Sequence, residues 1–217
     1  MAIYDTEEEQ LEQLKKWWET NNTSLITGVA TALVLVTGWN FWQSHQLEQR
    51  SQTSQVYQQV LEASAAGQAD GVEKNADQLL AEHASSAYAS YAALHKAKSR
   101  VQQGDLEGAK AILQQQMQTA ADEQIRHVAR LRLVQLMLAT QQYEAGLKLI
   151  AEVDPAKAEG YAASYDELEG DLYVAMDRLD EARNAYQNAI RSGKASPLAQ
   201  FKLDDIAVPS FEAGVTK

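Results

Sequence analysis

The side chains best suited to acid–base or metal chemistry are histidines, because the imidazole pKa lies near neutrality and its nitrogens bind transition metals. The sequence contains four of them: His45, His83, His95 and His127. They are dispersed, and no two have the spacing of a metal-ligand pair. His95 and His127 lie in segments predicted to be helical, so we expect them to be ordinary surface or packing residues.

A second candidate is the densest run of carboxylates in the chain: Asp166, Glu167, Glu169 and Asp171. Paired carboxylates can bind a divalent cation or act as general acid and base. Neighbouring positions of a helix point in different directions, however. We therefore expect a solvated helix face at this run rather than a site.

Other catalytic signatures are absent from the sequence. It has no cysteine, which excludes disulfides, thiolate zinc sites and cysteine nucleophiles. It also has no G-x-S-x-G, no glycine-rich phosphate loop and no H-E-x-x-H. We therefore expect no enzymatic activity, no catalytic, metal-binding or cofactor-binding residues, and no cofactor. An enzyme with an unrecognised site remains an alternative.

The formal net charge of −11 argues against some classes of partner. Phosphate binding needs clustered Lys and Arg, so a nucleic-acid partner is not expected. The same deficit of positive charge argues against docking on anionic lipid through a basic patch. An acidic surface is compatible with basic or unfolded partners, although it also serves simple solubility.

An apolar segment near the N-terminus is long enough to cross a bilayer. The stretch from Thr20 to Leu47 includes no Asp, Glu, Lys or Arg, and about 20 helical residues match the hydrocarbon core. Tryptophans stand on both sides of it, as in the aromatic belts of membrane helices. We predict a transmembrane helix at residues 24–43, preceded by a short cytoplasmic segment at residues 1–23.

A cleaved signal peptide is the competing interpretation of this segment. It is disfavoured because the leader is acidic and the apolar stretch ends in bulky aromatic residues. The orientation rests on positive charges: Lys15 and Lys16 precede the span, and only Arg50 follows it closely. Since positive residues favour the cytoplasmic side, we expect the N-terminus in the cytoplasm and the larger C-terminal part in the periplasm, across a bacterial inner membrane.

Two small residues within the predicted span, Gly28 and Ala32, lie about one helical turn apart. Small residues on one stripe let another membrane helix approach closely. They are therefore a candidate face for a partner helix. A plain lipid-facing surface is the alternative.

The rest of the chain has a helical composition and shows no period-two alternation. Residues 44–66 are predicted to form a polar, Gln-rich helix that Gly67 and Gly71 break, followed by a short helix to about His83. The sequence then aligns with itself in three units. They cover about residues 86–118, 125–153 and 161–192.

The register of these units is set by Leu106, Tyr143 and Leu179, which begin the second helix of each at offsets of 37 and 36 residues. These offsets are close to the period of about 34 in tetratricopeptide repeats. Small residues would allow two helices to approach, and larger ones would fill the gap to the next hairpin. The predicted repeat-packing positions are Ala97, Ala109, Leu113, Gly146, Ile150, Gly170, Tyr173, Ala182, Tyr186 and Ala189.

We therefore predict an all-α protein: an N-terminal transmembrane helix followed by a tetratricopeptide-repeat-like solenoid of helical hairpins at residues 44–206. An irregular bundle with accidental periodicity is the alternative. Residues 207–217 are expected to be a flexible C-terminal tail, and we assign them no function.

Three stretches carry a family resemblance. They are Gly38-Trp39 and Trp42 to Gln46 at the end of the predicted span, and Glu167 to Ala189 in the third unit. Together with the acidic leader and the overall length, they make the chain similar to the YfgM family, the ancillary subunit of the bacterial SecYEG translocon. The chain departs from the family in its tail beyond Ile206.

The resemblance implies a non-enzymatic, chaperone-like adaptor in the inner membrane, with its repeats in the periplasm. The partners it implies are the SecYEG translocon and the membrane-anchored chaperone PpiD. Translocating polypeptides are a further candidate partner, and the predicted span itself implies contact with membrane lipid. The subunit would assist the trafficking or folding of newly translocated proteins. A scaffold for envelope assembly or cell division, docking a folded partner through its repeats, is the alternative function.

Overall fold

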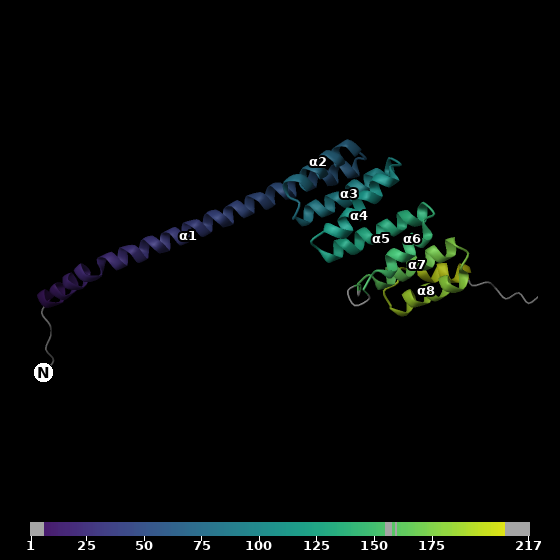
Figure 1. The fold of residues 1–217 in the computed structure, drawn as a ribbon. Helices are drawn as coiled ribbons and strands as arrows, with labels where there is room; N and C mark the ends of the chain where they lie inside the picture. The colour runs from purple at the N-terminus through teal and green to yellow at the C-terminus, as the bar shows by residue number, and fades with distance from the viewer. Residues whose placement is uncertain (1–6, 155–157, 159, 207–217) are drawn as a thin grey trace, which may run out of the picture. The chain divides into compact units, whose positions relative to one another are not determined.

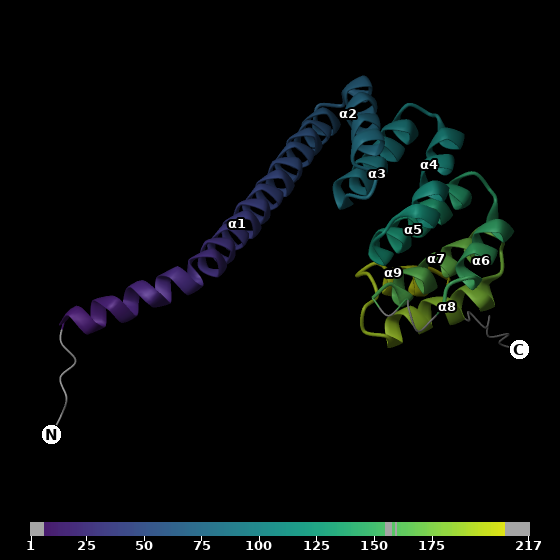
Figure 2. The ribbon, with the colours of Figure 1, turned by 60° about the vertical axis from the view of Figure 1, so that its left-hand side comes forward.

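The computed structural model describes residues 7–154, 158 and 160–206, and every regular element in this part of the chain is a helix. The helices in Figures 1 and 2 are α1 (Glu7–Ala65), α2 (Ala69–Glu82), α3 (Ala87–Gln102), α4 (Leu106–Thr119), α5 (Glu123–Ala139), α6 (Tyr143–Ala151), α7 (Ala162–Ala175), α8 (Leu179–Arg191) and α9 (Ala199–Ile206). The predicted fold class is confirmed. The predicted flexible tail lies outside the described residues.

The chain divides into two compact units, Met1–Gln52 and Thr53–Lys217. The described part of the first unit is a single helix whose apolar side chains are exposed, with Val34 at 69% and Phe41 at 76%. A helix surrounded by water would bury such residues against another element. The stretch Glu9–His45, which includes the predicted span, is the one helix in the described chain that is long and apolar enough to cross a membrane.

Threonine hydroxyls in this helix are satisfied by the helix itself. Thr27 donates to the carbonyl oxygen of Thr23 at 2.6 Å, and Thr31 donates to that of Thr27 at 2.8 Å. Hydrocarbon offers no water to satisfy a polar group, so an internal partner lowers the cost of burying these side chains in lipid. The threonines are therefore compatible with a membrane span.

Helical hairpins stacked in chain order build the second unit, as Figures 1 and 2 show for α2 to α8. Helix α3 pairs with α4, α5 with α6 and α7 with α8, and α9 packs on α8. The odd-numbered helices α3, α5 and α7 also contact one another in order. No comparable contacts join the even-numbered helices within the described chain. The densest contacts between hairpins join the second helix of one to the first helix of the next, as with α2 and α3 or α4 and α5. Each hairpin contacts mainly its neighbours, as in a repeat solenoid.

One further hairpin precedes the predicted units. Val60 and Ala63, near the end of α1, pack with Val72 and Leu79 of α2, and all four side chains are at most 6% exposed. Gly71 does not break the helix as expected but lies inside α2. A Cβ atom there would lie 3.0 Å from that of Ala63. The missing side chain thus allows the two helices to approach closely.

The turns inside the three predicted hairpins share one backbone conformation. Gly104, Gln141 and Asp177 have φ angles of 83°, 59° and 59°, and each lies two residues before the second helix of its hairpin. Left-handed backbone is free of steric cost only for glycine, so Gln141 and Asp177 each carry roughly 1 kcal/mol of strain. The repeat register is therefore visible in the turn geometry as well as in the packing.

Candidate partner-binding groove

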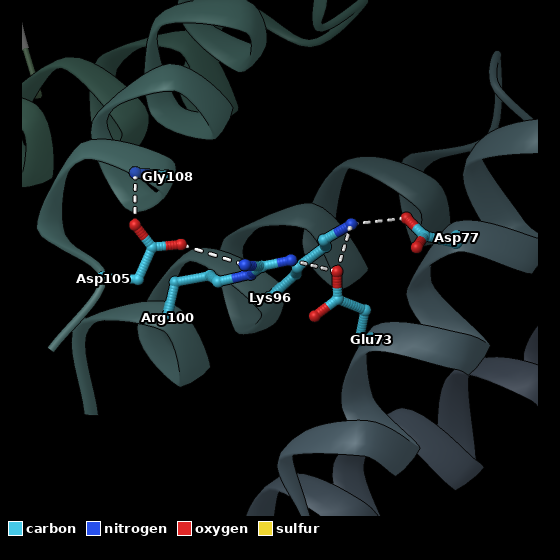
Figure 3. A network of polar contacts seen from close by, with 6 residues as sticks. All are labelled: Glu73, Asp77, Lys96, Arg100, Asp105 and Gly108. Carbon is cyan, nitrogen blue, oxygen red and sulfur yellow. Dashed lines mark hydrogen bonds and ion pairs between the residues drawn. The ribbon is translucent and has the colours of Figure 1, made fainter. Parts of the chain in front are cut away.

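A network of ion pairs fixes the start of the repeat stack (Figure 3). Lys96 of α3 lies 2.6 Å from Asp77 and 3.3 Å from Glu73, both on α2. Arg100 of α3 contacts Glu73 as well, and its second guanidinium nitrogen lies 2.9 Å from Asp105, the N-cap residue of α4. Three successive helices are thus connected through two cations. Both cations are engaged within the protein, which leaves little of their charge for a partner.

Asp105 makes the stability of this network dependent on pH. The Gly108 N–H that donates to its carboxylate, followed by Arg100, lowers the pKa of Asp105 below its ordinary value of 3.8. The folded state therefore binds the proton less tightly than the unfolded state. The stabilisation by the ionised Asp105 carboxylate is fully present above the ordinary pKa of 3.8. It is lost as the pH falls below 3.8 and through the lowered pKa of the folded state.

We expect the stability advantage of the wild-type chain over Asp105→Asn to shrink as the pH falls from 6 to about 3. Asparagine keeps an oxygen that can cap α4 but cannot titrate. Urea unfolding of both full chains in mild detergent, followed by circular dichroism at several pH values, measures this difference. A difference that stayed constant over this range would contradict the assignment.

A mostly apolar depression lies between α3, α4 and α5, with a volume of about 490 Å³. Its residues come from one stripe on each of α3 and α5 and from a single position of α4. They are Leu94, Ala97, Lys98, Val101, Leu113, Arg132, Gln135 and Leu136. The leucines and Ala97 belong to the core and are at most 9% exposed, so they form a firm floor, whereas Lys98, Arg132 and Gln135 are exposed.

A second depression of about 340 Å³ lies along α5, α7 and the segment leading into α9, and Gln135 lines this one too. Its carboxylates are already engaged. Glu167 accepts hydrogen bonds from the backbone N–H and the hydroxyl of Ser196. Asp171 accepts one from the hydroxyl of Tyr186 and pairs with Lys202, each at 2.6 Å. We call the two depressions together the α3–α7 groove.

A family model described as a tetratricopeptide repeat-like domain matches residues 15–208. The chain is 30% identical over 211 residues to the ancillary SecYEG translocon subunit of Escherichia coli, covering 96% of this chain and 100% of the relative. The chain belongs to the family of ancillary SecYEG translocon subunits. Proteins of the same name from Haemophilus influenzae and Neisseria gonorrhoeae are 29% and 25% identical, each over 95% of this chain and 100% of the relative. No solved structure matches.

In this member of the ancillary subunit family, the repeat-packing positions lie mostly in the core. Eight are buried: Ala97, Ala109, Leu113, Gly146, Gly170, Ala182, Tyr186 and Ala189. Ile150 and Tyr173 are half-buried. The structure distributes these residues over successive core clusters rather than bringing them to one place, and only Ala97 and Leu113 also line the α3–α7 groove.

Gly28 and Ala32 lie in the first unit, on one stripe of α1. Together with Thr27, Thr31 and Leu35 they line a shallow depression of the helix surface. A Cβ atom at Gly28 would meet nothing within 4 Å. The stripe is therefore open, and a larger side chain there would not disturb the described fold.

Two of the histidines lie in the repeats and pack against other side chains. The Nδ1 atom of His127 lies 2.8 Å from the Tyr165 hydroxyl, and its ring stacks on Tyr161. Burial is the main cause that raises the pKa of Tyr165 to about 12. The Nδ1 atom of His95 lies 3.2 Å from the Ser64 hydroxyl. No group of three possible metal ligands occurs among the described residues.

The carboxylate run of α7 differs from the solvated face that was expected. Glu167 and Asp171 hold the C-terminal segment and line the α3–α7 groove. Asp166 is half-buried, and its pKa is raised by burial and then by Glu169. For Glu167 and Asp171 the reason is that Ser196 and Lys202 of the C-terminal segment reach α7 while α9 packs on α8, a contact that helix periodicity alone does not predict.

The groove residues Lys98, Arg132 and Gln135 were not singled out from the sequence. Leu94, Lys98 and Val101 have the spacing of one helical stripe, but such a stripe faces either a neighbouring helix or solvent. Only the placement of α5 beside α3 shows that this one borders a depression.

Proposed function

We propose that the chain is a membrane-anchored, non-enzymatic adaptor that associates with the SecYEG translocon and assists the periplasmic trafficking or folding of newly translocated proteins. The observation that carries this proposal is similarity over nearly the whole chain to proteins named as ancillary translocon subunits. The exposed apolar helix and the repeat stack with its groove are the two parts that such a role requires.

The proposed topology places residues 1–23 in the cytoplasm, 24–43 in the inner membrane and 44–206 in the periplasm. It is supported by Lys15 and Lys16 before the span against Arg50 alone soon after it. In this arrangement the repeats face polypeptides that leave the translocon. The membrane-anchored chaperone PpiD is proposed as a second partner, because it would act on the same polypeptides.

A non-enzymatic role fits what the described side chains do. The candidate acid–base residues serve packing or hold helices together, as His127 does with Tyr165 and Asp171 with Lys202. Solenoids of this kind present extended surfaces to other proteins. The proposal therefore includes no cofactor and no bound metal.

The stripe formed by Gly28 and Ala32 is proposed as the contact with a translocon or partner helix. Close approach of two membrane helices depends on small residues, because lipid removes the hydrophobic driving force between them. We expect Gly28→Leu with Ala32→Leu to lower recovery of SecYEG subunits about tenfold or more in a mild-detergent pull-down after crosslinking. The matched control, Ala30→Leu with Val34→Leu, changes the opposite face of the same helix and should keep wild-type recovery.

The same experiment tests the function as a whole. Wild-type chain should recover SecYEG subunits, and crosslinkers placed along the groove should capture secretory precursors during translocation. If SecYEG is absent and a different envelope complex is recovered, the proposal is wrong. If crosslinks reach only a folded partner and never a precursor, the scaffold alternative holds instead. If both leucine variants recover SecYEG subunits as well as the wild-type chain does, the helix serves only as a membrane anchor.

A further inference from the structure

We propose that the depression between α3 and α5 binds a bulky apolar side chain of a translocating polypeptide that carries a carboxylate beside that side chain. This inference rests on the adaptor function proposed above and names the segments that the repeats would select. Three features carry it: the apolar floor, two cations at the rim that form no ion pair with a described residue, and a neighbouring depression that Gln135 also lines.

The floor is built to receive an apolar group. Ala97 and Leu113 are each 2% exposed, so they are fixed by the core beneath and cannot move aside to close the space. Val101, which is 37% exposed, forms an apolar wall that a ligand can cover. Covering such surface is favourable because it removes apolar area from water. A depression of about 490 Å³ has room for a large aliphatic or aromatic side chain.

The rim of the depression carries positive charge that no described carboxylate neutralises through an ion pair. Lys98 and Arg132 line the depression from opposite helices, and neither forms an ion pair with a residue that the structure describes. The neighbouring cations Lys96 and Arg100, by contrast, are engaged by carboxylates of α2 and the α4 cap. In a chain of net charge −11, two free cations beside an apolar surface favour a carboxylate on the ligand.

The positive charges of Lys98 and Arg132 also act on His95, the neighbouring histidine of α3. The pKa of His95 is lowered by burial first and then by Lys98 and Arg132. Both cations, which line the same depression, therefore act on the same group. A ligand carboxylate placed between them would be attracted by both, and an arginine can hold it through two hydrogen bonds.

The shape of the groove favours an extended polypeptide over a compact ligand. Gln135 lines both depressions, so they are neighbours on α5, and an extended chain is the ligand that could occupy both. The amide of Gln135 can donate to and accept from a peptide backbone at that junction. The carboxylates of the second depression are satisfied by Ser196, Tyr186 and Lys202. Selectivity by charge is thus concentrated at Lys98 and Arg132.

The test uses the purified full chain in mild detergent and three fluorescein-labelled peptides of equal length made of Gly and Ser around a central position. The first carries Leu flanked by Glu, the second Leu flanked by Lys, and the third Ser flanked by Glu. We expect fluorescence anisotropy to show binding of the first about tenfold tighter than of the other two. Binding should weaken as salt is raised, because exposed charges are screened.

The variant Lys98→Glu with Arg132→Glu should reverse this preference, losing the Glu-flanked peptide and gaining the Lys-flanked one. Both residues are exposed, so their replacement leaves the core intact. The control Lys74→Glu with Lys148→Glu changes the net charge equally at exposed positions outside the groove, and it should behave as wild type. Equal binding of the three peptides, or equal losses in both variants, would overturn the inference.

The two proposals fail separately. If SecYEG recovery is retained in the Lys98→Glu, Arg132→Glu variant while peptide preference is reversed, both hold. If wild-type chain shows the peptide preference but recovers no SecYEG, the adaptor function is wrong and the groove chemistry stands. If SecYEG is recovered but the peptides are not distinguished, the groove inference alone is wrong.

Discussion

Replacing Gly170 by alanine is expected to lower the free energy of unfolding by about 3 kcal/mol. A Cβ atom at Gly170 of α7 would lie 2.5 Å from Cε1 of Tyr186 on α8, with two further ring atoms within 2.9 Å. The ring has no room to retreat, because Tyr186 is 2% exposed and its hydroxyl donates to Asp171 at 2.6 Å. The third hairpin would have to separate. Urea unfolding of the full chain in mild detergent measures the loss.

A double-mutant cycle with Tyr186→Leu isolates this contact. Leucine removes the ring that the new methyl group would strike, so part of the cost of Gly170→Ala should disappear in the double variant. We expect the loss in free energy of unfolding of the double variant to be about 1–2 kcal/mol smaller than the sum of the two single losses. Additive losses would show that Gly170 matters for a reason other than the approach of α7 to α8.

The second large effect is expected for Leu172→Ala, at about 3 kcal/mol. Leu172 is fully buried and packs with Val134 of α5 and Leu168 of α7. Its side chain also lies against Gly146 of α6, where both δ carbons would be 3.1 Å from an added Cβ atom. Truncation therefore leaves a cavity where three helices meet.

The matched control for this prediction is Val174→Ala, on the same helix. Val174 is 37% exposed, so its truncation should cost less than about 1 kcal/mol. Similar losses at the two positions, measured by the same urea titration, would contradict the proposed junction of α5, α6 and α7.

Helix pairing in the repeats was predictable from the sequence because it depends on local spacing. Leu106, Tyr143 and Leu179 do begin α4, α6 and α8, and the predicted family is confirmed. The first hairpin was not recognised as a unit. In the sequence alone Gly71 predicts a helix break, whereas in the structure its missing side chain lets α2 approach Ala63. A glycine in a helix and a glycine in a turn are indistinguishable without knowledge of the opposing element.

The candidate groove was largely unpredictable for a related reason. Lys98 and Lys96 are both lysines on α3, yet Lys98 borders a depression and forms no ion pair with a described residue, whereas Lys96 pairs with Asp77 of α2. Their difference arises from which neighbouring helix each faces. Likewise, the engagement of Asp171 by Lys202 joins positions 31 residues apart through the return of α9. Contacts of this range follow from the stacking of hairpins rather than from periodicity.

The restriction of contacts to neighbouring hairpins has a consequence for how the protein opens. Removing the last hairpin deletes contacts of the one before it but leaves the others almost untouched. Unfolding can therefore begin at α9, which packs on α8, and proceed stepwise towards α2. Amide hydrogen exchange should accordingly be fastest in α9 and slower towards the middle of the stack. Such graded opening would let the protein loosen the repeats at α7 to α9 while those at α2 to α4 stay folded.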